Sequence, residues 1–436
     1  MQSTANKPSP DIYSRVAAVL KGEKPDRLPF IDRLELWFTT HRLAGTLPQE
    51  FQARDTASPM VASVQMARPQ DYSGLSLSDI HRAVGMGQQV FETLYARRLP
   101  GAELIVRLEG ETIYRETDPV VDYFPRLYDI LPSDRPGVTV AEVITPVGKL
   151  TMRSQLVPDM VESGTLPYMQ EHPIKDESDY RVLEYLVERA EYVPKHDKVH
   201  REQAEMGNIG FVLPLLTRVP FQRLLLDFVG EVPLFFMIHD TPRLIERMVA
   251  LLDELIVDDI RRVADFTGLY VQFPDNVDGV ITNPALFKTY SLPYYQRYAD
   301  LLHGQGKKVG SHTDGNLKPI LSLLAESGLD VCESFSPAPL TACTFGEAWE
   351  AWQDGPIIWG GIPSPLLQQR TPECEFRRYV QHVLETVGER PIILGVGDMV
   401  MGNNLIERVR YIADRVEEHI IRSPSTFTCA ERRSIG

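Results

Sequence analysis

The chain has 436 residues, 43% of them hydrophobic and 24% charged, a composition that excludes a disordered polypeptide and permits a large buried core. Its formal net charge of −15 argues against a general nucleic-acid-binding protein, which needs basic surfaces to displace counterions. No apolar run approaches the roughly 20 residues of a membrane-spanning helix, and the N-terminus lacks the apolar core of a signal peptide, so we expect a cytoplasmic protein with reduced cysteines.

The first part of the chain, residues 1–27, is predicted to form a loose tail and one helix. IYSRVAAVLKGEKPDR has apolar residues at helical spacing, and Gly22 and Pro25 end that pattern. LPFID, residues 28–32, then predicts a short buried strand. A mostly helical pattern, interrupted by proline and glycine, follows over residues 40–100.

The pattern changes at residue 103, where apolar and polar residues begin to alternate. AELIVRLEGETIYRET and VTVAEVITPVGKLTMRS both show a period of two, and PVG in the second stretch supplies a turn. We therefore expect a small insertion of antiparallel strands at about 103–153, beside the main domain. Helical patterns then cover about 176–206 and 240–265, with the apolar run IGFVLPLL between them.

The chain becomes regular after residue 269, where five short apolar strands alternate with amphipathic helices. The strands are GLYVQF, KKVGSH, LDVCESF, PIIWGG and PIILGVG. This order is typical of repeated βα units and a parallel sheet, and five units in one direction favour a (β/α)8 TIM barrel. We expect the barrel to occupy residues 28–422 and to leave 423–436 as a tail. No GxGxxG follows a strand, which disfavours a dinucleotide-binding fold.

In such a barrel the carboxyl ends of all strands meet at one mouth, where catalytic residues lie. His312 and Asp314 both lie at the end of KKVGSH, and their spacing of two directs them to the same side. A neutral imidazole beside carboxylates suits a divalent metal. The same residues could instead cap the helix that begins near Asn316, and Asp398 could be either a mouth ligand or a first-turn acid.

Several long segments carry a resemblance to a known family. GSHTDGNLKPILSLLAESGLDV, IIWGGIPS and PIILGVGDMV are similar to blocks of the uroporphyrinogen decarboxylase superfamily, and so are RVAAVLKGEKPDRLPF and VQFPDNVDGVITNPALFKTYSLPYYQRYADLLHGQGKKV. The resemblance covers nearly the whole chain, although the strands at 103–153 match only through TPVG. It implies a (β/α)8 barrel, in agreement with the alternation of strands and helices.

Two branches of that superfamily differ in the residues that they require. Decarboxylases of uroporphyrinogen carry an arginine-rich RQAGR segment after the first strand, whereas this chain has DRLELWFTTHR, with Arg33 alone near the strand. A substrate rich in carboxylates should need more guanidinium groups than that. The resemblance is therefore closer to the corrinoid-dependent methyltransferases of the O-demethylase type.

Those methyltransferases hold zinc on a His-x-Cys pair and a later cysteine. The resemblance places His312 on that histidine, Asp314 on the first cysteine and Asp398 near the second, so carboxylates replace both thiolates. One interpretation is a site for zinc or another divalent metal, better suited to polarising oxygen than to holding a thiol. The other is that the metal is lost with the cysteines, and that these residues bind an unrelated substrate by hydrogen bonds.

Other polar residues at strand ends are further candidates for the site. Asp275 lies in a block where the superfamily has substrate-contacting polar groups, and Glu333 ends the strand LDVCE, with Cys332 on the opposite, core-facing side. Each of these residues could instead have a structural role, in a turn, in an ion pair with a neighbouring cation or in core packing. The candidates for catalysis are Asp275, Glu333 and Arg33, and those for substrate binding are Asn276, Asp278 and Trp37.

The leading functional hypothesis is a methyltransferase that moves a methyl group from a small oxygenated donor, of the methyl ether type, to a cobalamin or a corrinoid protein. Because the chain contains no DxHxxG sequence, the corrinoid would arrive on a partner protein or as free cofactor. Two alternatives stay open: a metal-independent, decarboxylase-like lyase that acts on a small carboxylic acid through Asp275 and Arg33, and a catalytically silent barrel that binds a corrinoid or tetrapyrrole. We expect no nucleic-acid or membrane partner, and a homodimer stays open.

Overall fold

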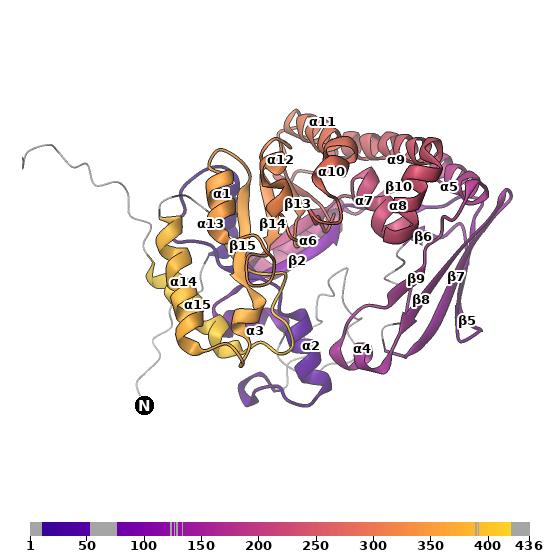
Figure 1. Ribbon diagram of the computed structural model, residues 1–436. Coiled ribbons are helices and arrows are strands. Elements are labelled where there is room, and N and C mark those ends of the chain that lie inside the picture. Colours follow the sequence, from indigo (N-terminus) through magenta and orange to yellow (C-terminus); the bar gives the residue numbers. More distant parts are fainter. Residues whose placement is uncertain are drawn as a thin grey trace, which may run out of the picture.

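Eight parallel strands form a single closed sheet in the computed structural model (Figure 1). The first and last strands meet, because the amide of Leu394 donates to the carbonyl of Pro29 at 2.9 Å and Phe30 pairs with Leu394. The predicted (β/α)8 barrel is therefore confirmed. In sheet order the strands are β1 (Ile31–Asp32), β2 (Gly87–Thr93), β11 (Gly210–Leu215), β12 (Tyr270–Phe273), β13 (Lys308–His312), β14 (Val331–Phe335), β15 (Ile357–Pro363) and β16 (Ile393–Gly397). The residues that the structure describes are 11–52, 76–388 and 390–419, apart from 123, 126, 128, 129, 133 and 391.

Helices cover the outside of the barrel and connect its strands, as the regular pattern after residue 269 predicts. Within the described ranges no helix combines the length and the apolar character needed to cross a bilayer. The helices are α2 (Glu35–Leu43), α3 (Leu77–Val84), α6 (His196–Met206), α7 (Pro220–Arg223), α8 (Glu231–Asp240), α9 (Pro242–Arg262), α10 (Pro284–Tyr290), α11 (Leu292–His303), α12 (Leu321–Ala325), α13 (Phe345–Ala351), α14 (Glu373–Val387) and α15 (Ile406–Glu418).

The predicted N-terminal helix, α1 (Ile12–Leu20), closes the amino-terminal end of the barrel. Asp11 caps the helix by accepting a hydrogen bond from the amide of Ser14 at 3.0 Å. The buried face of α1 shares an apolar cluster with side chains of the barrel interior, including Phe211 and Trp359. A site inside the barrel would therefore lie at the opposite, carboxyl-terminal mouth. The predicted tails, residues 1–10 and 423–436, lie outside the described residues.

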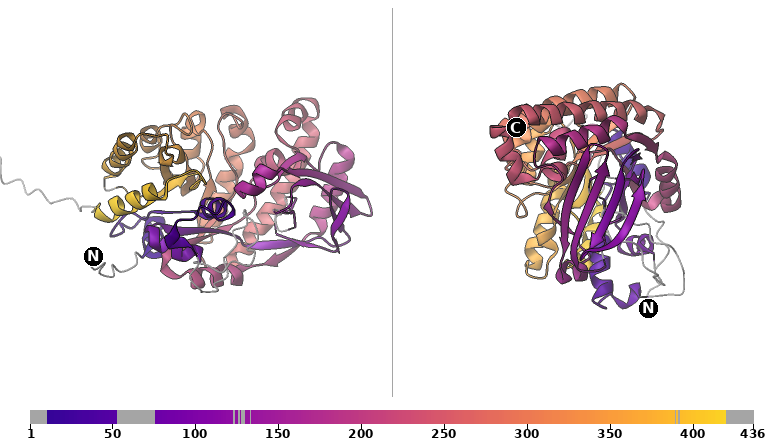
Figure 2. Two further views of the ribbon diagram at one scale, coloured as in Figure 1. Left: turned by 90° about the horizontal axis from the view of Figure 1, so that it is seen from below. Right: turned by 90° about the vertical axis from the view of Figure 1, so that its right-hand side faces the viewer.

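An insertion of antiparallel strands separates β2 from β11 and extends beyond the predicted range 103–153 at both ends. Figure 2 shows the strands of its larger sheet side by side, in the view from the right of Figure 1. The segment also contains α4 (Pro158–Ser163) and α5 (Glu177–Arg189). The smaller sheet has the order β10 (Glu191–Pro194), β3 (Tyr95–Arg98), β6 (Val120–Val121), and the larger has β5 (Glu111–Thr117), β4 (Glu103–Leu108), β7 (Gly137–Thr145), β8 (Gly148–Leu156), β9 (Tyr168–Glu171).

Two helical predictions were wrong at particular segments. The mostly helical interpretation of residues 40–100 missed β2 and β3. In GQQVFET one glutamine, Gln89, faces the barrel interior and the other, Gln88, faces α3, so the strand has no clear alternation of apolar and polar residues. The helix expected over 176–206 is divided into α5 and α6 by β10, which pairs with β3. In both cases strand pairing overrides the local pattern.

Gly360, on β15, offers a test of how closely the barrel strands pack. Its φ is +131°, and a Cβ added there would lie 2.5 Å from the carbonyl oxygen of Phe335. We expect Gly360→Ala to lower the free energy of unfolding by about 2 kcal/mol or more, because both the backbone conformation and the space exclude a side chain. Denaturant titration followed by circular dichroism would measure the change.

The matched control is Gly346→Ala in α13, where an added Cβ meets no described atom within 4 Å. Alanine there should leave stability unchanged or raise it by up to about 1 kcal/mol. Equal effects of the two substitutions would contradict the close packing of β14 and β15.

Candidate active site

His312 ends β13, and its two ring nitrogens have different partners. Nδ1 lies 2.5 Å from Oε2 of Glu333. Nε2 faces two carboxylates, with Oδ2 of Asp314 at 3.7 Å and Oδ1 of Asp398 at 3.6 Å. The rings of Phe91 and His312 pack nearly perpendicular to each other, with the centroids 5.9 Å apart, and His312 is almost fully buried. A neutral imidazole that donates its Nδ1 hydrogen to Glu333 therefore presents its Nε2 lone pair to the space between the two aspartates.

Glu333, on β14, holds His312 in place. Its carboxylate accepts hydrogen bonds from Gln89 at 2.6 Å and Gln272 at 2.8 Å, in addition to the contact with His312. Burial acts to raise the pKa of Glu333, but the charges of His312 and Arg33 outweigh it, so the pKa is lower than usual. Glu333 is thus an ionised, fully hydrogen-bonded carboxylate that orients the imidazole.

His312, Asp314 and Asp398 form a cluster whose geometry suits one metal ion. One possible ligand atom of each residue lies within 4.8 Å of those of the other two. Two ligands that each lie about 2.0 to 2.2 Å from a common zinc ion are separated by at most about 4.4 Å. The two distances from Nε2 satisfy that limit, so one imidazole nitrogen and two carboxylate oxygens could hold a divalent ion after small side-chain adjustments.

Arg33 fixes the position of Asp398. Its Nη2 lies 3.0 Å from Oδ1 and 3.2 Å from the carbonyl oxygen of Asp398. The guanidinium is buried and lies over the ring of Phe91, 4.7 Å from the centroid. Arg33 follows β1 and Asp398 follows β16, so this ion pair ties together the two strands that close the barrel.

A chain of hydrogen bonds supports Asp314 from the other side. Asn276 donates to Oδ2 of Asp314 at 3.2 Å, and Arg218 donates to Oδ1 of Asn276 at 3.0 Å and to Asp227 at 2.8 Å. Asn276 has a φ of 53°, in the left-handed region that asparagine tolerates better than most residues. The predicted role of Asn276 in substrate binding is untested, and the structure shows that it orients Asp314.

The electrostatics of the cluster favour positive charge at its centre. Burial acts to lower the pKa of His312, but the carboxylates of Glu333, Asp314 and Asp398 outweigh it and raise the pKa to about 9. Burial, together with the charge of Asp398, raises the pKa of Asp314, while His312 acts in the opposite direction. A cation at this position therefore relieves repulsion between acidic groups.

The structure places two further candidates outside this cluster. Both carboxylate oxygens of fully buried Asp275 accept hydrogen bonds, from the amide of Val219 and from the hydroxyls of Tyr295 and Ser311. Burial raises the pKa of Asp275 to about 6. Asp278 accepts hydrogen bonds from backbone amides of its own turn and of Asn316. These contacts are structural, and no contact tests the predicted roles in catalysis and substrate binding.

Trp37 also has contacts that packing explains. Its Nε1 donates to the carbonyl of Asn404 at 3.1 Å, and its ring is buried against Phe51 and His41. Its predicted contact with substrate is likewise untested. Cys332 is fully buried in the cluster beneath the outer helices, on the opposite side of β14 from Glu333, as the alternation along the strand predicts.

Three residues of the site were missing from the sequence prediction. Gln89 and Gln272 face the barrel interior and bind Glu333, and Arg218 follows β11 and binds Asn276. Arg218 stands directly after IGFVLPLLT, so treating that run as a barrel strand would have placed it at the mouth. Gln89 had no such signal, since β2 itself was missed.

A closed (β/α)8 barrel with ionisable side chains gathered at the carboxyl ends of its strands defines the class of protein. The chain belongs to the uroporphyrinogen decarboxylase (URO-D) family, whose model matches residues 159–419, more than half of the chain. The matched segment contains β11 to β16 and all three residues of the cluster, while β1, β2 and most of the insertion precede it. No curated protein matches the chain.

Solved structures show only distant similarity. A methyltransferase from Methanosarcina mazei has 14% sequence identity over 93% of this chain and 98% of its own, with a TM-score of 0.45. A Bacteroidetes-affiliated GH5 cellulase has 11% identity over 53% of this chain and 77% of its own, with a TM-score of 0.34. The octameric ribulose-1,5-bisphosphate carboxylase/oxygenase of Pyrococcus horikoshii has 13% identity over 54% of this chain and 46% of its own, with a TM-score of 0.27. Similarities this weak carry no argument about activity.

Glu35, the first residue of α2, is a buried acid beside the site that the sequence did not single out. Its carboxylate accepts no hydrogen bond from any other described residue. Burial raises the pKa of Glu35 to about 7, although the charge of Arg33 acts in the opposite direction. An acid with a raised pKa in the folded state destabilises the protein as pH rises, because the unfolded chain releases that proton at lower pH.

We expect this cost to appear between pH 4.5 and 7 and to be complete above pH 7, where it amounts to about 3 kcal/mol. Glu35→Gln removes the titration, so its unfolding free energy relative to wild type should rise by about 2 to 3 kcal/mol from pH 5 to pH 8. Denaturant titrations at several pH values would measure the difference. Glu375→Gln, at an exposed position of α14, is the control and should show no such trend. A flat difference for Glu35→Gln would contradict the assignment.

Proposed function

We propose that the chain is a methyltransferase that moves a methyl group from a small methyl ether-type donor to a cobalamin or a corrinoid protein. In this proposal a divalent metal, zinc or another, is held by His312, Asp314 and Asp398 and polarises the donor. The observation that carries the proposal is the convergence of one imidazole nitrogen and two carboxylates at the barrel mouth. Membership of the uroporphyrinogen decarboxylase family is consistent with a site at that mouth.

The charge balance of the site supports a divalent cation. Glu333, Asp314 and Asp398 supply three carboxylates, and Arg33 supplies one positive charge through its ion pair with Asp398. Two negative charges then remain when His312 is neutral, and a divalent ion would compensate both. Carboxylates and imidazole are also ligands that bind zinc and harder divalent metals without a thiolate.

Each of the three proposed metal ligands is positioned by a different neighbouring residue. Glu333 keeps the Nδ1 side of His312 occupied, so that Nε2 is available to the metal, and such supporting hydrogen bonds tune both affinity and activity. Arg33 positions Asp398, and Asn276 positions Asp314. The ring of Phe91 packs nearly perpendicular to that of His312, with an angle of 89° between the ring planes.

The reaction that this arrangement suits is cleavage of the bond between the donor oxygen and its methyl carbon. The electron pair of the broken bond stays on the oxygen, which later takes a proton from water, and the reduced cobalt of the acceptor supplies the pair for the new bond to carbon. Bound metal would stabilise the negative charge on the leaving oxygen.

Porphyrinogen decarboxylation fits the site less well. The guanidinium of Arg33 is buried and already paired with Asp398, so it is poorly placed to bind the carboxylates of a large substrate. The metal-independent lyase is the second candidate, and one observation favours it: the buried His312–Glu333 pair could serve as an acid and base without metal. Asp275, the acid first assigned to that reaction, has both oxygens engaged in hydrogen bonds.

Metal content gives the first test of the proposal. Protein purified without chelator should contain close to one equivalent of zinc or another divalent metal by elemental analysis. His312→Ala and Asp314→Ala should each lose it, because two remaining ligands bind a metal weakly. His303→Ala is the control, since His303 also pairs with a carboxylate, Asp330 at 2.7 Å, but lies on the surface outside the cluster. Absence of metal from wild type, even after incubation with zinc, would contradict the proposed site.

Methyl transfer gives the second test, with chemically reduced cobalamin as the acceptor and a panel of methyl ethers as donors. The change in the cobalamin spectrum reports the transfer. Glu333→Gln should lower the rate about 10- to 100-fold with metal still bound. The substitution removes the carboxylate that orients His312, which weakens the coordination of the metal by this histidine but leaves the ligand itself in place. The proposal would be overturned in favour of the lyase if the protein demethylated none of the ethers and instead decarboxylated a small acid in the presence of chelator.

A further inference from the structure

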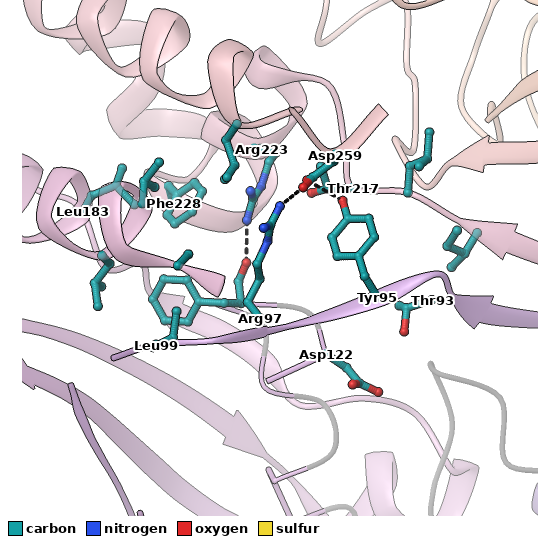
Figure 3. Close-up of a pocket in the computed structure, with 17 residues that line it drawn as sticks. Thr93, Tyr95, Arg97, Leu99, Asp122, Leu183, Thr217, Arg223, Phe228 and Asp259 are labelled. Atoms are coloured by element: carbon teal, nitrogen blue, oxygen red, sulfur yellow. Dashed lines mark hydrogen bonds and ion pairs between the residues drawn. The ribbon is translucent and has the colours of Figure 1, made fainter. Parts of the chain in front are cut away.

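A cavity lies at the seam between the insertion and the barrel, and none of the residues that line it belongs to the acidic cluster. It contains about 590 Å³ of space that no atom fills, part of it open to solvent. One wall comes from β3 and α5 of the insertion, and the other from the ends of β2 and β11 and from α7 and α9 (Figure 3). The walls are mainly apolar, with Leu99, Leu183 and Phe228 on the side nearest Arg223.

Two arginines lie next to each other in this cavity (Figure 3). Arg97 is paired with Asp259, which also accepts a hydrogen bond from the hydroxyl of Tyr95 at 2.7 Å. Burial and the charge of Arg223 act together to lower the pKa of Arg97. The charge of Arg97 is therefore compensated within the protein, while the adjacent Arg223 adds a second positive charge.

The charge of Arg223 is only partly compensated. Its side chain is only 7% exposed, and its guanidinium donates a hydrogen bond to a neutral group, the carbonyl of Phe124, at 2.5 Å. Nε makes no hydrogen bond to any described residue and lies 3.8 Å from Asp227, whose other oxygen accepts from Arg218 at 2.8 Å. A buried guanidinium in this state favours an anionic ligand.

The two carboxylates that line the cavity have other partners than Arg223. Asp259 binds Arg97 and Tyr95, and Asp122 accepts a hydrogen bond from Lys195 at 2.5 Å. The cavity thus combines one incompletely compensated cation with apolar and aromatic walls. Few, well-placed polar groups in an apolar pocket are typical of small-molecule sites.

We propose that this seam cavity binds a small monocarboxylate with an apolar, preferably aromatic, body, and that Arg223 contacts its carboxylate. The body would pack between Phe228 and the leucines of the insertion wall. The proposal concerns binding alone and does not rest on the proposed methyl transfer. Its ligand site includes Arg97 and Leu99, which precede the segment that matches the family model.

Binding of 3-phenylpropanoate, compared with the neutral 3-phenylpropanamide, tests the proposal. Calorimetry is performed with chelator present, so that a carboxylate cannot bind through metal at His312. We expect wild type to bind the acid at least tenfold more tightly than the amide, because only the acid forms a charged pair with Arg223. Equal affinities, or no binding of the acid, would overturn the proposal.

Arg223→Met keeps the aliphatic part of the side chain. It should weaken binding of the acid at least tenfold and leave the affinity for the amide unchanged. Arg261→Met, on an exposed position of α9, is the matched control and should bind both compounds as wild type does. Unchanged binding of the acid by Arg223→Met would overturn the assignment. Should that variant fail to fold, Ala190→Phe at the partly exposed rim of the cavity should reduce binding of both compounds, and unaltered binding there would overturn the location.

Discussion

The hydrogen bonds to the buried carboxylate of Glu333 are the constraint on which the site depends. An ionised carboxylate in a protein interior costs several kcal/mol unless its oxygens are paired. Gln89, Gln272 and His312 supply those partners from β2, β12 and β13, so the cost is offset only when four strands of the barrel are in register. The orientation of His312, with Nε2 facing the two aspartates, follows from the same contacts.

This arrangement also explains why the barrel interior is divided into an apolar and a polar part. Near the amino-terminal end, α1 and the inward side chains of several strands form one apolar cluster, which includes Tyr270 and Trp359. Toward the mouth, the interior contains Glu333, His312 and Arg33. All three are buried, Glu333 lies at hydrogen-bonding distance from His312, and Arg33 forms an ion pair with Asp398. The apolar part provides stability through burial, while the polar part uses its charges to position the side chains of the site.

The sequence was sufficient to predict the second half of the barrel, because β12 to β16 are short apolar runs separated by strongly amphipathic helices. The same logic failed at β2, where Gln89 faces inward to bind Glu333 and so removes the apolar signal. The spacing of His312 and Asp314 was enough to predict that they point to the same side, whereas the position of Asp398 near them was inferred from the family resemblance. The structure places all three residues in one cluster. The hydrogen bonds that occupy Asp275 had no counterpart in the sequence, because its partners Val219, Tyr295 and Ser311 come from separate segments.

The insertion is joined to the barrel by charged contacts, and these contacts shape the seam. Arg97 and Tyr95 of β3 both bind Asp259 of α9, and Lys195, after β10, contacts Glu92 of β2 at 2.7 Å and Asp122 of the insertion at 2.5 Å. Such buried pairs fix relative position more than they add stability. The barrel therefore holds the acidic cluster, while the insertion supplies one of the two walls of the cavity at the seam. Changes within the insertion could alter the ligand of that cavity without disturbing any contact of His312, Asp314 or Asp398.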